Sequence, residues 1–245
     1  MNKLYTIYVI FKLLINEIKK VGIIKILISL ITFLIVILFI YKTRKEDVLS
    51  TSYSLIPFIG IYMIIFYGGS ISSEIENGSL KYYLTKPIKR WKIYLSKLLS
   101  IYLYLIMIIF YILFIYLVII DKINYSFIIK FIKYSVPLFF MATFILFIST
   151  SIKNTAVCIG IDIFILTFST LISQVFFGIE LNIIEYTFLP YLDFNIFNDI
   201  NALNEMNNEL GIHLSMKSGI IIDIIYMIFF YYLGNIIFIN KDVKN

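Results

Sequence analysis

The sequence is short of the residues from which metal sites and covalent catalytic sites are built. It contains one cysteine, Cys158, and one histidine, His213. A single thiol forms neither an internal disulfide nor a thiolate metal cluster. A single histidine, placed in a loop, provides no zinc-binding helix pair and no serine–histidine couple. We therefore expect no metal site and no catalytic residues in this chain.

Charged residues are also scarce, at 15%, against 61% hydrophobic residues, and the mean hydropathy is +0.94. Such a composition is typical of an integral membrane protein. Because only 10 glycines and 4 prolines occur in 245 residues, the membrane spans should be helices with few breaks. We predict an all-α fold. The net charge of +6 does not indicate nucleic-acid binding, because the cations cluster beside apolar runs.

A complete nucleotide-binding loop is missing as well. The stretch GIHLSMKS, residues 211–218, imitates a phosphate-binding loop, but Met216 stands where the second glycine is needed. A side chain at that position keeps the backbone from closing on a phosphate, and no strand precedes the stretch. The sequence therefore predicts no ATPase within this chain.

Apolar runs of about 20 residues, the length needed to cross a bilayer, recur along the chain. They predict six transmembrane helices, at 23–41, 49–71, 98–120, 131–152, 155–177 and 218–240. Most Lys and Arg residues fall on the cytoplasmic side if both termini are cytoplasmic, which predicts a multi-pass protein of the cell membrane with that orientation. The cations Lys42, Arg44 and Lys45 disagree with this orientation, although two acidic residues follow them.

The segments that flank these spans have patterns of their own. Residues 1–22 place Lys12, Asn16 and Lys19 on one helical face, which predicts an interfacial helix on the cytoplasmic leaflet. Residues 178–217 interleave acidic and apolar residues, which predicts one or two short outer helices between spans five and six. We expect the whole chain, 1–245, to form a single transmembrane domain.

Two carboxylates fall within predicted spans. Asp162 lies about two turns into the fifth span, and Asp223 lies more than a turn into the sixth. An ionisable group costs about 2.5 to 3.5 kcal/mol at the centre of a membrane helix, so each is a candidate intramembrane polar site for an ion or a substrate. The alternative is that both face the bundle or water near the span ends and bond to neighbouring groups.

The stretch between spans two and three is dense in cations and contains the single tryptophan, Trp91. Glu74 and Glu76 come just after a span, and Gly78 permits a sharp turn out of the bilayer. The residues SLKYYL then predict a short helix, which Pro87 ends or restarts. Residues 74–97 thus predict a transverse helix and an elbow that leads into span three. Charge alone does not distinguish this arrangement from an ordinary cytoplasmic loop.

The order of residues in this stretch is more specific. It resembles the signature between the second and third spans of the type-2 permeases of ATP-binding-cassette (ABC) exporters, on the residues Glu74, Gly78, Ser79, Leu80, Leu84, Pro87, Arg90 and Lys97. The sequence departs from that signature at Lys89, beside the arginine, and at Ser96, where glycine commonly precedes the lysine. The stretch YTFLPYLDFN around Pro190 and the outline of six spans also resemble that family.

The resemblance implies the membrane subunit of an ATP-driven exporter. Two permease subunits, alike or different, would form the substrate path and bind two separate ABC ATPase subunits, which would hold ATP and Mg²⁺. This chain would hold no cofactor. The segment from 74 to 97 would be the coupling segment that the ATPases move, through the residues Glu74, Glu76, Gly78, Lys81, Pro87 and Arg90. Glu74 and Glu76 would meet basic groups on the ATPases, and the cations of this segment would meet acidic groups or membrane lipid. The apolar and aromatic spans favour an amphipathic peptide or a drug-like or lipid-like compound as cargo.

Two other functions stay open on the sequence. The chain is alternatively an ATP-independent, ion-coupled carrier or channel that uses Asp162 and Asp223. It is otherwise a membrane anchor or sensor subunit that binds an ATPase without moving a solute. A neighbouring reading frame with a Walker A motif would favour the exporter over the carrier.

Overall fold

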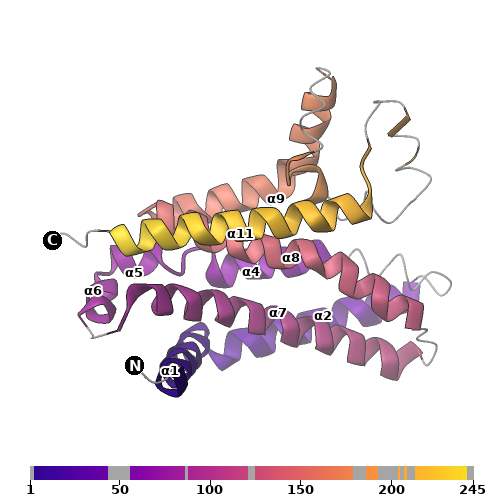
Figure 1. The fold of residues 1–245 in the computed structure, drawn as a ribbon. Helices are drawn as coiled ribbons and strands as arrows, with labels where there is room; N and C mark the ends of the chain where they lie inside the picture. The colour runs from indigo at the N-terminus through magenta and orange to yellow at the C-terminus, as the bar shows by residue number, and fades with distance from the viewer. Residues whose placement is uncertain are drawn as a thin grey trace.

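The computed structural model describes residues 3–43, 56–85, 88–120, 125–178, 186–192, 204, 207–208 and 213–241. All regular secondary structure in these ranges is helical, which confirms the predicted all-α class (Figure 1). The elements are α1 (Lys3–Val21), α2 (Ile23–Thr43), α4 (Ile56–Tyr67), α5 (Ser72–Glu76), α6 (Ser79–Leu84), α7 (Arg90–Ile120), α8 (Tyr125–Ser151), α9 (Thr155–Gly178), the 3-10 turn η2 (Pro190–Leu192) and α11 (Met216–Asn240).

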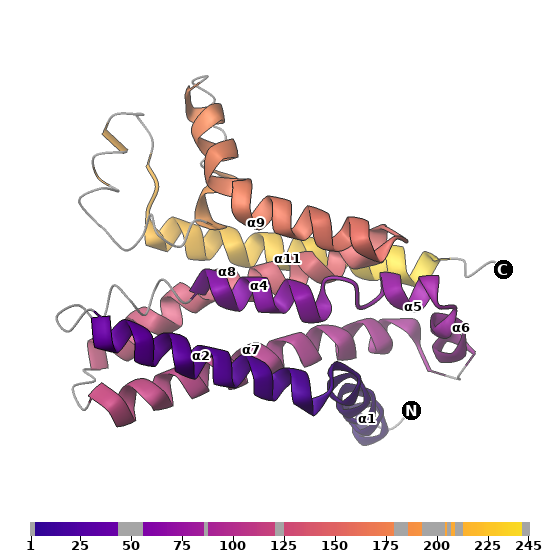
Figure 2. The same ribbon diagram turned by 180° about the vertical axis from the view of Figure 1, so that it is seen from behind.

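The long helices run along a common direction and form a bundle, from which the last turns of α9 bend away (Figures 1 and 2). Helix α8 lies at its centre and packs on α11, α7 and α4, while α1 crosses one end of α7. The core between them is apolar. Its fully buried side chains include Ile59, Tyr94, Ile101, Phe140 and Ile145. Burial of such side chains is the main favourable term for helix packing where water is the alternative.

The helices meet the requirements for a membrane protein. Three segments in the described part of the chain are long and apolar enough to cross a bilayer: Phe58–Glu76, Arg90–Ile115 and Lys217–Asn240. The bent pair formed by α1 and α2, at 67°, raises the number to four if it counts as one span. The shorter apolar helices Ser135–Ser151 and Thr155–Ser169 accompany them. The membrane class is thereby supported, and the six-span topology stays a prediction.

Large apolar side chains on the outside of the bundle fit a lipid environment. Ile24, Ile28 and Ile35 on α2 are exposed by 73%, 54% and 58%, and Ile225 and Tyr232 on α11 are equally exposed, at 58% and 60%. Contiguous exposed apolar surface of this kind is rare on a soluble monomer. It is expected on a helix that faces lipid, where only the backbone must be satisfied internally.

Several predicted span limits agree closely with the helices, and two differ. The second span is broken after Tyr67 by a turn that contains Gly68 and Gly69, and the chain resumes as α5. Helix α7, by contrast, runs without a break from Arg90, whereas we expected an elbow before Leu98. No glycine or proline lies between these two residues, and their apolar spacing continues that of the span, so the helix has no reason to end.

The described part of the outer segment packs into the bundle. The ring centroid of Phe188 lies 4.9 Å from that of Phe140 and 5.3 Å from that of Tyr226, in tilted and edge-to-face contacts. Tyr191 of η2 is 1% exposed and lies against Gly219, where a Cβ would approach its ring to 2.6 Å. Part of the predicted outer helices lies outside the described residues. The described residues include the 3-10 turn at Pro190 and helical positions at 204 and 207–208.

Candidate functional site

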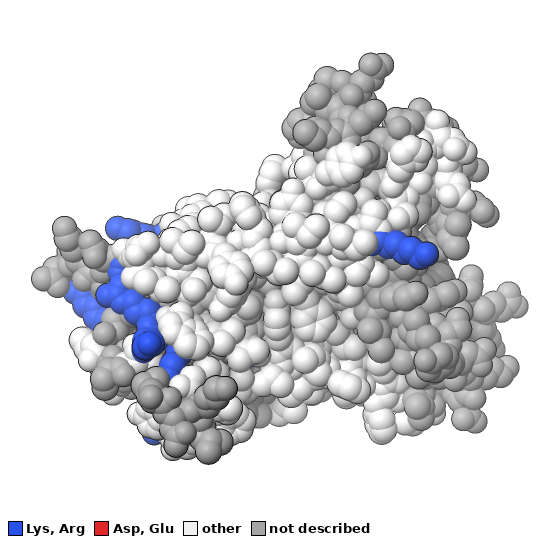
Figure 3. Space-filling model, viewed as in Figure 1, with Lys and Arg blue, Asp and Glu red and all other residues white. Residues whose placement is uncertain are grey.

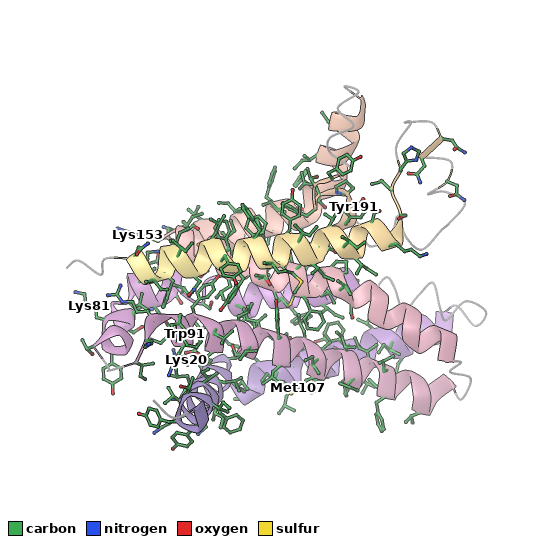
Figure 4. The ribbon with its side chains drawn as sticks, viewed as in Figure 1. Lys20, Lys81, Trp91, Met107, Lys153 and Tyr191 are labelled. Atoms are coloured by element: carbon green, nitrogen blue, oxygen red, sulfur yellow. The ribbon has the colours of Figure 1, made fainter. Side chains whose placement is uncertain are left out.

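Basic side chains gather at one end of the bundle, where α6 lies and α11 ends (Figure 3). We call this the basic end. Lys20, Lys81 and Lys153 all lie there, as does Trp91 (Figure 4). The predicted coupling segment therefore sits at a distinct end of the molecule.

Helices α5 and α6 are joined by a tight turn at Gly78. This glycine has φ +68°, in the left-handed region that other residues enter only with strain. The prediction that Gly78 provides a sharp turn is confirmed. Helix α6 spans the residues SLKYYL, as predicted, and lies across the end of the bundle (Figure 2). Lys81 and Tyr82 are exposed on it.

The break between α4 and α5 is held by a serine of α8. Ser149 Oγ accepts hydrogen bonds from the backbone N–H groups of Ile71, at 2.9 Å, and Ser72, at 3.1 Å. These groups begin α5 and have no partner within the helix. Close packing against α9 also fixes this break, because a Cβ on Gly69 would lie 2.3 Å from Thr155 Cγ2. The start of α5 is thus fixed to both α8 and α9.

A buried set of four charges joins three helices at the basic end. Lys97 Nζ of α7 lies 2.9 Å from Glu17 Oε2 of α1 and 2.8 Å from Glu74 Oε1 of α5. Lys20 Nζ lies 2.9 Å from Glu17 Oε1 and also pairs with Glu74 Oε1. We call these four residues the ionic network. Its formal charges sum to zero, and each lysine bridges both carboxylates.

The ionic network is unequally buried. The side chains of Lys97, Glu74 and Glu17 are exposed by 2%, 9% and 10%, whereas that of Lys20 is exposed by 39%. Burial alone would raise the pKa of Glu17, but Lys97 and Lys20 outweigh it and hold the pKa below the usual value. Glu17 is therefore a carboxylate at neutral pH, and its ion pairs replace the hydration that it loses.

The second acidic residue of the segment, Glu76, holds the start of α9. Its Oε1 accepts a hydrogen bond of 3.1 Å from Thr155 N, and its Oε2 accepts one from Thr155 Oγ1. An acidic side chain is favourable at a helix N-terminus, where backbone N–H groups lack partners. Glu76 thus connects α5 to α9.

The basic residue Arg90 holds the end of α11. Its Nη1 donates to the carbonyl oxygens of Ile239, at 2.7 Å, and Lys241, at 3.1 Å. Lys241 Nζ donates in turn to the carbonyl oxygen of Thr150, near the end of α8. A cation is favourable at a helix C-terminus because the last carbonyl groups lack backbone partners. Arg90 thus connects the start of α7 to the last helix of the bundle.

The two carboxylates that were predicted to lie within spans do not share a site. Asp162 and Asp223 are 0% and 1% exposed, and neither has a hydrogen-bond partner among the described residues. Asp162 lies seven residues from the start of α9 and faces Gly68, whereas Asp223 lies near the opposite end of α11. At 1.5 Å per residue the two lie about 15 Å apart along the bundle. In the described residues, no three His, Cys, Asp or Glu side chains form a metal-binding group.

A family model described as a protein of unknown function, DUF2705, matches residues 43–244. The chain belongs to the DUF2705 family. The matched region contains α5, α6 and α7, and so includes Glu74, Glu76, Arg90 and Lys97. It leaves out α1, which supplies Glu17 and Lys20. A comparison with curated proteins finds no match.

In this DUF2705 protein, the predicted coupling residues have different surroundings. Glu74, Glu76 and Arg90 are all bonded to other helices of the same chain, whereas we expected the two acidic residues to face a partner. Lys81 is exposed on α6. Pro87 lies outside the described residues.

Three members of the ionic network, Glu17, Lys20 and Lys97, were not among the predicted site residues, although Lys97 belongs to the signature that the segment resembles. A signal for Glu17 does exist in the sequence. It is the acidic residue of an otherwise basic N-terminal segment, and Leu13 and Val21 lie four residues before and after it. An acidic residue on such an apolar helical stripe indicates a buried partner. The sequence does not tell which cation provides it.

Proposed function

We propose that this DUF2705 protein is the membrane subunit of an ATP-driven ABC exporter, which works as a pair of permeases with separate ATPase subunits. One observation carries the proposal. The α5–α6 segment, whose residue order resembles the coupling signature, sits at the basic end and is bonded to α1, α7, α8 and α9. Because of these bonds, a displacement of α6 by the ATPase would move several helices together.

The proposed topology has six spans, formed by α2, α4, α7, α8, α9 and α11, with both termini and the basic end in the cytoplasm. Helix α8, with 27 residues, is about 40 Å long, which exceeds the hydrocarbon thickness of about 30 Å. Helix α9 has 24 residues, and its last turns bend away from the bundle (Figure 2). The cations of the basic end then follow the positive-inside rule and lie beside anionic lipid.

The contacts divide the coupling residues into two groups. Lys81 and Tyr82 are exposed on α6, and Tyr82 has 66% of its surface accessible, so these side chains would touch the ATPase. Glu74 and Arg90 would instead transmit its movement, because their partners lie on α7 and α11 of the same chain. An exposed ion pair contributes roughly 0 to 1 kcal/mol, so the aromatic ring should dominate docking.

Co-expression with the ATPase encoded nearest to this chain tests the division. We expect Tyr82→Ala combined with Lys81→Glu to reduce both capture of the ATPase and its stimulated ATP hydrolysis. We expect Glu74→Gln to leave capture intact and to reduce stimulated hydrolysis. Lys217→Gln, an exposed cation at the opposite end of α11, is the matched control and should change neither.

The proposal is wrong if no ATPase associates with the chain, or if the two α6 substitutions behave like the Lys217 control. If the ATPase binds but no compound changes its turnover, the chain is an anchor or sensor. Cargo is identified in the same reconstituted pair, by asking which amphipathic peptides or lipid-like compounds raise ATP hydrolysis.

A second function, an ion-coupled carrier or channel, is favoured by the buried carboxylates without partners. Asp162 lies at the helix break beside Gly68, where a bound cation or proton would satisfy it. This function predicts uptake driven by an ion gradient in vesicles that contain the chain alone. Asp162→Asn should abolish that uptake, while leaving ATPase capture unchanged.

A further inference from the structure

A cavity of about 440 Å³ opens beside the ionic network at the basic end. Helices α1, α2, α4, α5 and α6 all contribute to its wall. Its polar lining includes Lys20, Lys25, Ser73, Glu74 and Ser79. Two of its lining residues, Glu74 and Tyr82, also belong to the proposed coupling contacts, and the chemistry of the cavity is that of a binding site.

The charges around the cavity favour an anion. The ionic network, part of which lines the wall, is neutral by itself. Lys25 adds one positive charge, and it forms no ion pair with another described residue. The cavity wall together with Lys97 beneath it therefore carries a net charge of +1. A ligand with one negative charge neutralises it.

The wall of the cavity also contains hydroxyl groups that a ligand can reach. Ser73 and Ser79 belong to the wall, and Ser79 is exposed. A serine hydroxyl both donates and accepts hydrogen bonds. Hydroxyl groups of a ligand beside the anion would find partners there.

Apolar surface begins at the rim of the cavity. Val21 and Phe66 are part of its wall, and Ile24 and Ile65, which adjoin the lining residues Lys25 and Phe66 in sequence, are exposed by 73% and 56%. A ligand in the cavity thus has a polar pocket on one side and the lipid-facing surface of α2 and α4 on the other. This combination fits a molecule with a charged head and long acyl chains.

We propose that the cavity binds the headgroup of an anionic phospholipid of the phosphatidylglycerol type. Its phosphodiester lies by Lys25 and Lys20, and its glycerol hydroxyls lie by the hydroxyl groups of Ser73 and Ser79. The shared chemistry, a phosphate ester with hydroxyl donors, also exists in free glycerophosphate. The exposed Ile24 and Ile65 favour the lipid, because only the lipid has chains that cover them.

Phosphatidylethanolamine is the closest competitor. Its ammonium group also donates hydrogen bonds, but its headgroup has no net charge and leaves the charge of the cavity at +1. We therefore expect phosphatidylglycerol to bind more tightly than phosphatidylethanolamine, and phosphatidylcholine, which has no hydrogen-bond donor, to bind least.

Native mass spectrometry of the full, delipidated chain in detergent measures this preference directly. Dioleoyl forms of the three lipids are titrated in turn. Lys25→Gln should weaken phosphatidylglycerol binding about five-fold, the effect of one cation near a lipid headgroup. Lys89→Gln, an exposed cation of the basic end that does not line the cavity, is the matched control and should leave binding unchanged.

A second variant tests the cavity without changing any charge. Ser73→Phe places a ring in the cavity and should reduce phosphatidylglycerol binding at least as much as Lys25→Gln. Its melting temperature in detergent verifies that the protein is folded. Any of three results would overturn the proposal. The three lipids bind equally, Lys25→Gln and Lys89→Gln have equal effects, or Ser73→Phe binds phosphatidylglycerol as the unchanged protein does. Displacement of the lipid by equimolar glycerophosphate would overturn the lipid as the source of the phosphate.

Discussion

Replacing Lys97 by methionine should destabilise the chain more than any other single change in the ionic network. Methionine keeps the length and the apolar stem of lysine but removes its charge. The substitution leaves the carboxylates of Glu17 and Glu74, each about 10% exposed or less, to face one another. Only Lys20, which is 39% exposed, then compensates them.

The magnitude follows from this difference in exposure. Removing one partner of a buried ion pair costs about 3 to 5 kcal/mol, because an uncompensated charge stays behind. An ion pair of a largely hydrated lysine contributes about 0 to 1 kcal/mol. Lys97→Met should therefore reduce the free energy of unfolding by about 2 kcal/mol or more beyond the loss for Lys20→Met.

Unfolding in mixed micelles, titrated with a denaturing detergent, provides the measurement. Far-ultraviolet circular dichroism reports the helices, and fluorescence of Trp91, the single tryptophan, reports the start of α7. Lys97→Met combined with Glu74→Gln should recover part of the loss, since contacting charges show coupling energies of about 0.5 to 3 kcal/mol. This recovery separates charge compensation from the loss of lysine packing.

Two results would refute the reasoning. If Lys97→Met and Lys20→Met cost the same, burial does not set the strength of these pairs. If the double variant is as unstable as the sum of its single variants, Lys97 and Glu74 do not interact energetically, whatever their distance.

Three further predictions concern local geometry and pH. Gly78→Ala should cost about 1 kcal/mol of stability through its positive φ alone, because nothing lies within 4 Å of the new methyl group. The control is Gly160→Ala, at a helical glycine that also has no atom within 4 Å of the new methyl group, and it should cost nothing. Gly234→Ala should cost about 1 to 3 kcal/mol by overpacking, since its Cβ would lie 2.1 Å from the hydroxyl of Tyr94, and Gly160→Ala again serves as reference in the same unfolding titration. The pKa of Glu17 is lower in the folded chain than in the unfolded chain. Its contribution to stability is therefore present above the unfolded pKa and is lost as pH falls through the folded pKa. Stability should decline below about pH 4.3, and Glu17→Gln should flatten that decline.

The helices themselves were largely predictable, because lipid imposes a simple rule on sequence. A run of apolar residues must form a helix long enough to cross, so the limits of α2, α9 and α11 agree with the predicted spans to within a few residues. The turn at Gly78 was predictable for a similar reason, since glycine alone enters its backbone conformation without strain. Both predictions depend only on residues that are close together in the sequence.

The ionic network was not predictable, because its geometry depends on how distant helices pack. Glu17 is 80 residues from Lys97 along the chain, and no local spacing relates the two. The same holds for Arg90 and Ile239, which are 149 residues apart. The sequence indicates that charges occur near these span ends. Only the tertiary fold determines that they pair within the chain.

The ionic network also affects where this protein can be divided. The region shared with DUF2705 begins at residue 43, so a fragment cut at that boundary would lack Glu17 and Lys20. Lys97 and Glu74 would retain each other, but loss of α1 would expose the surface of α7 that it covers, and both side chains, to solvent or detergent. Expression from residue 43 should give a protein that aggregates. Adding a polypeptide of residues 1–42, which supplies α1 and nearly all of α2, in trans should rescue its solubility.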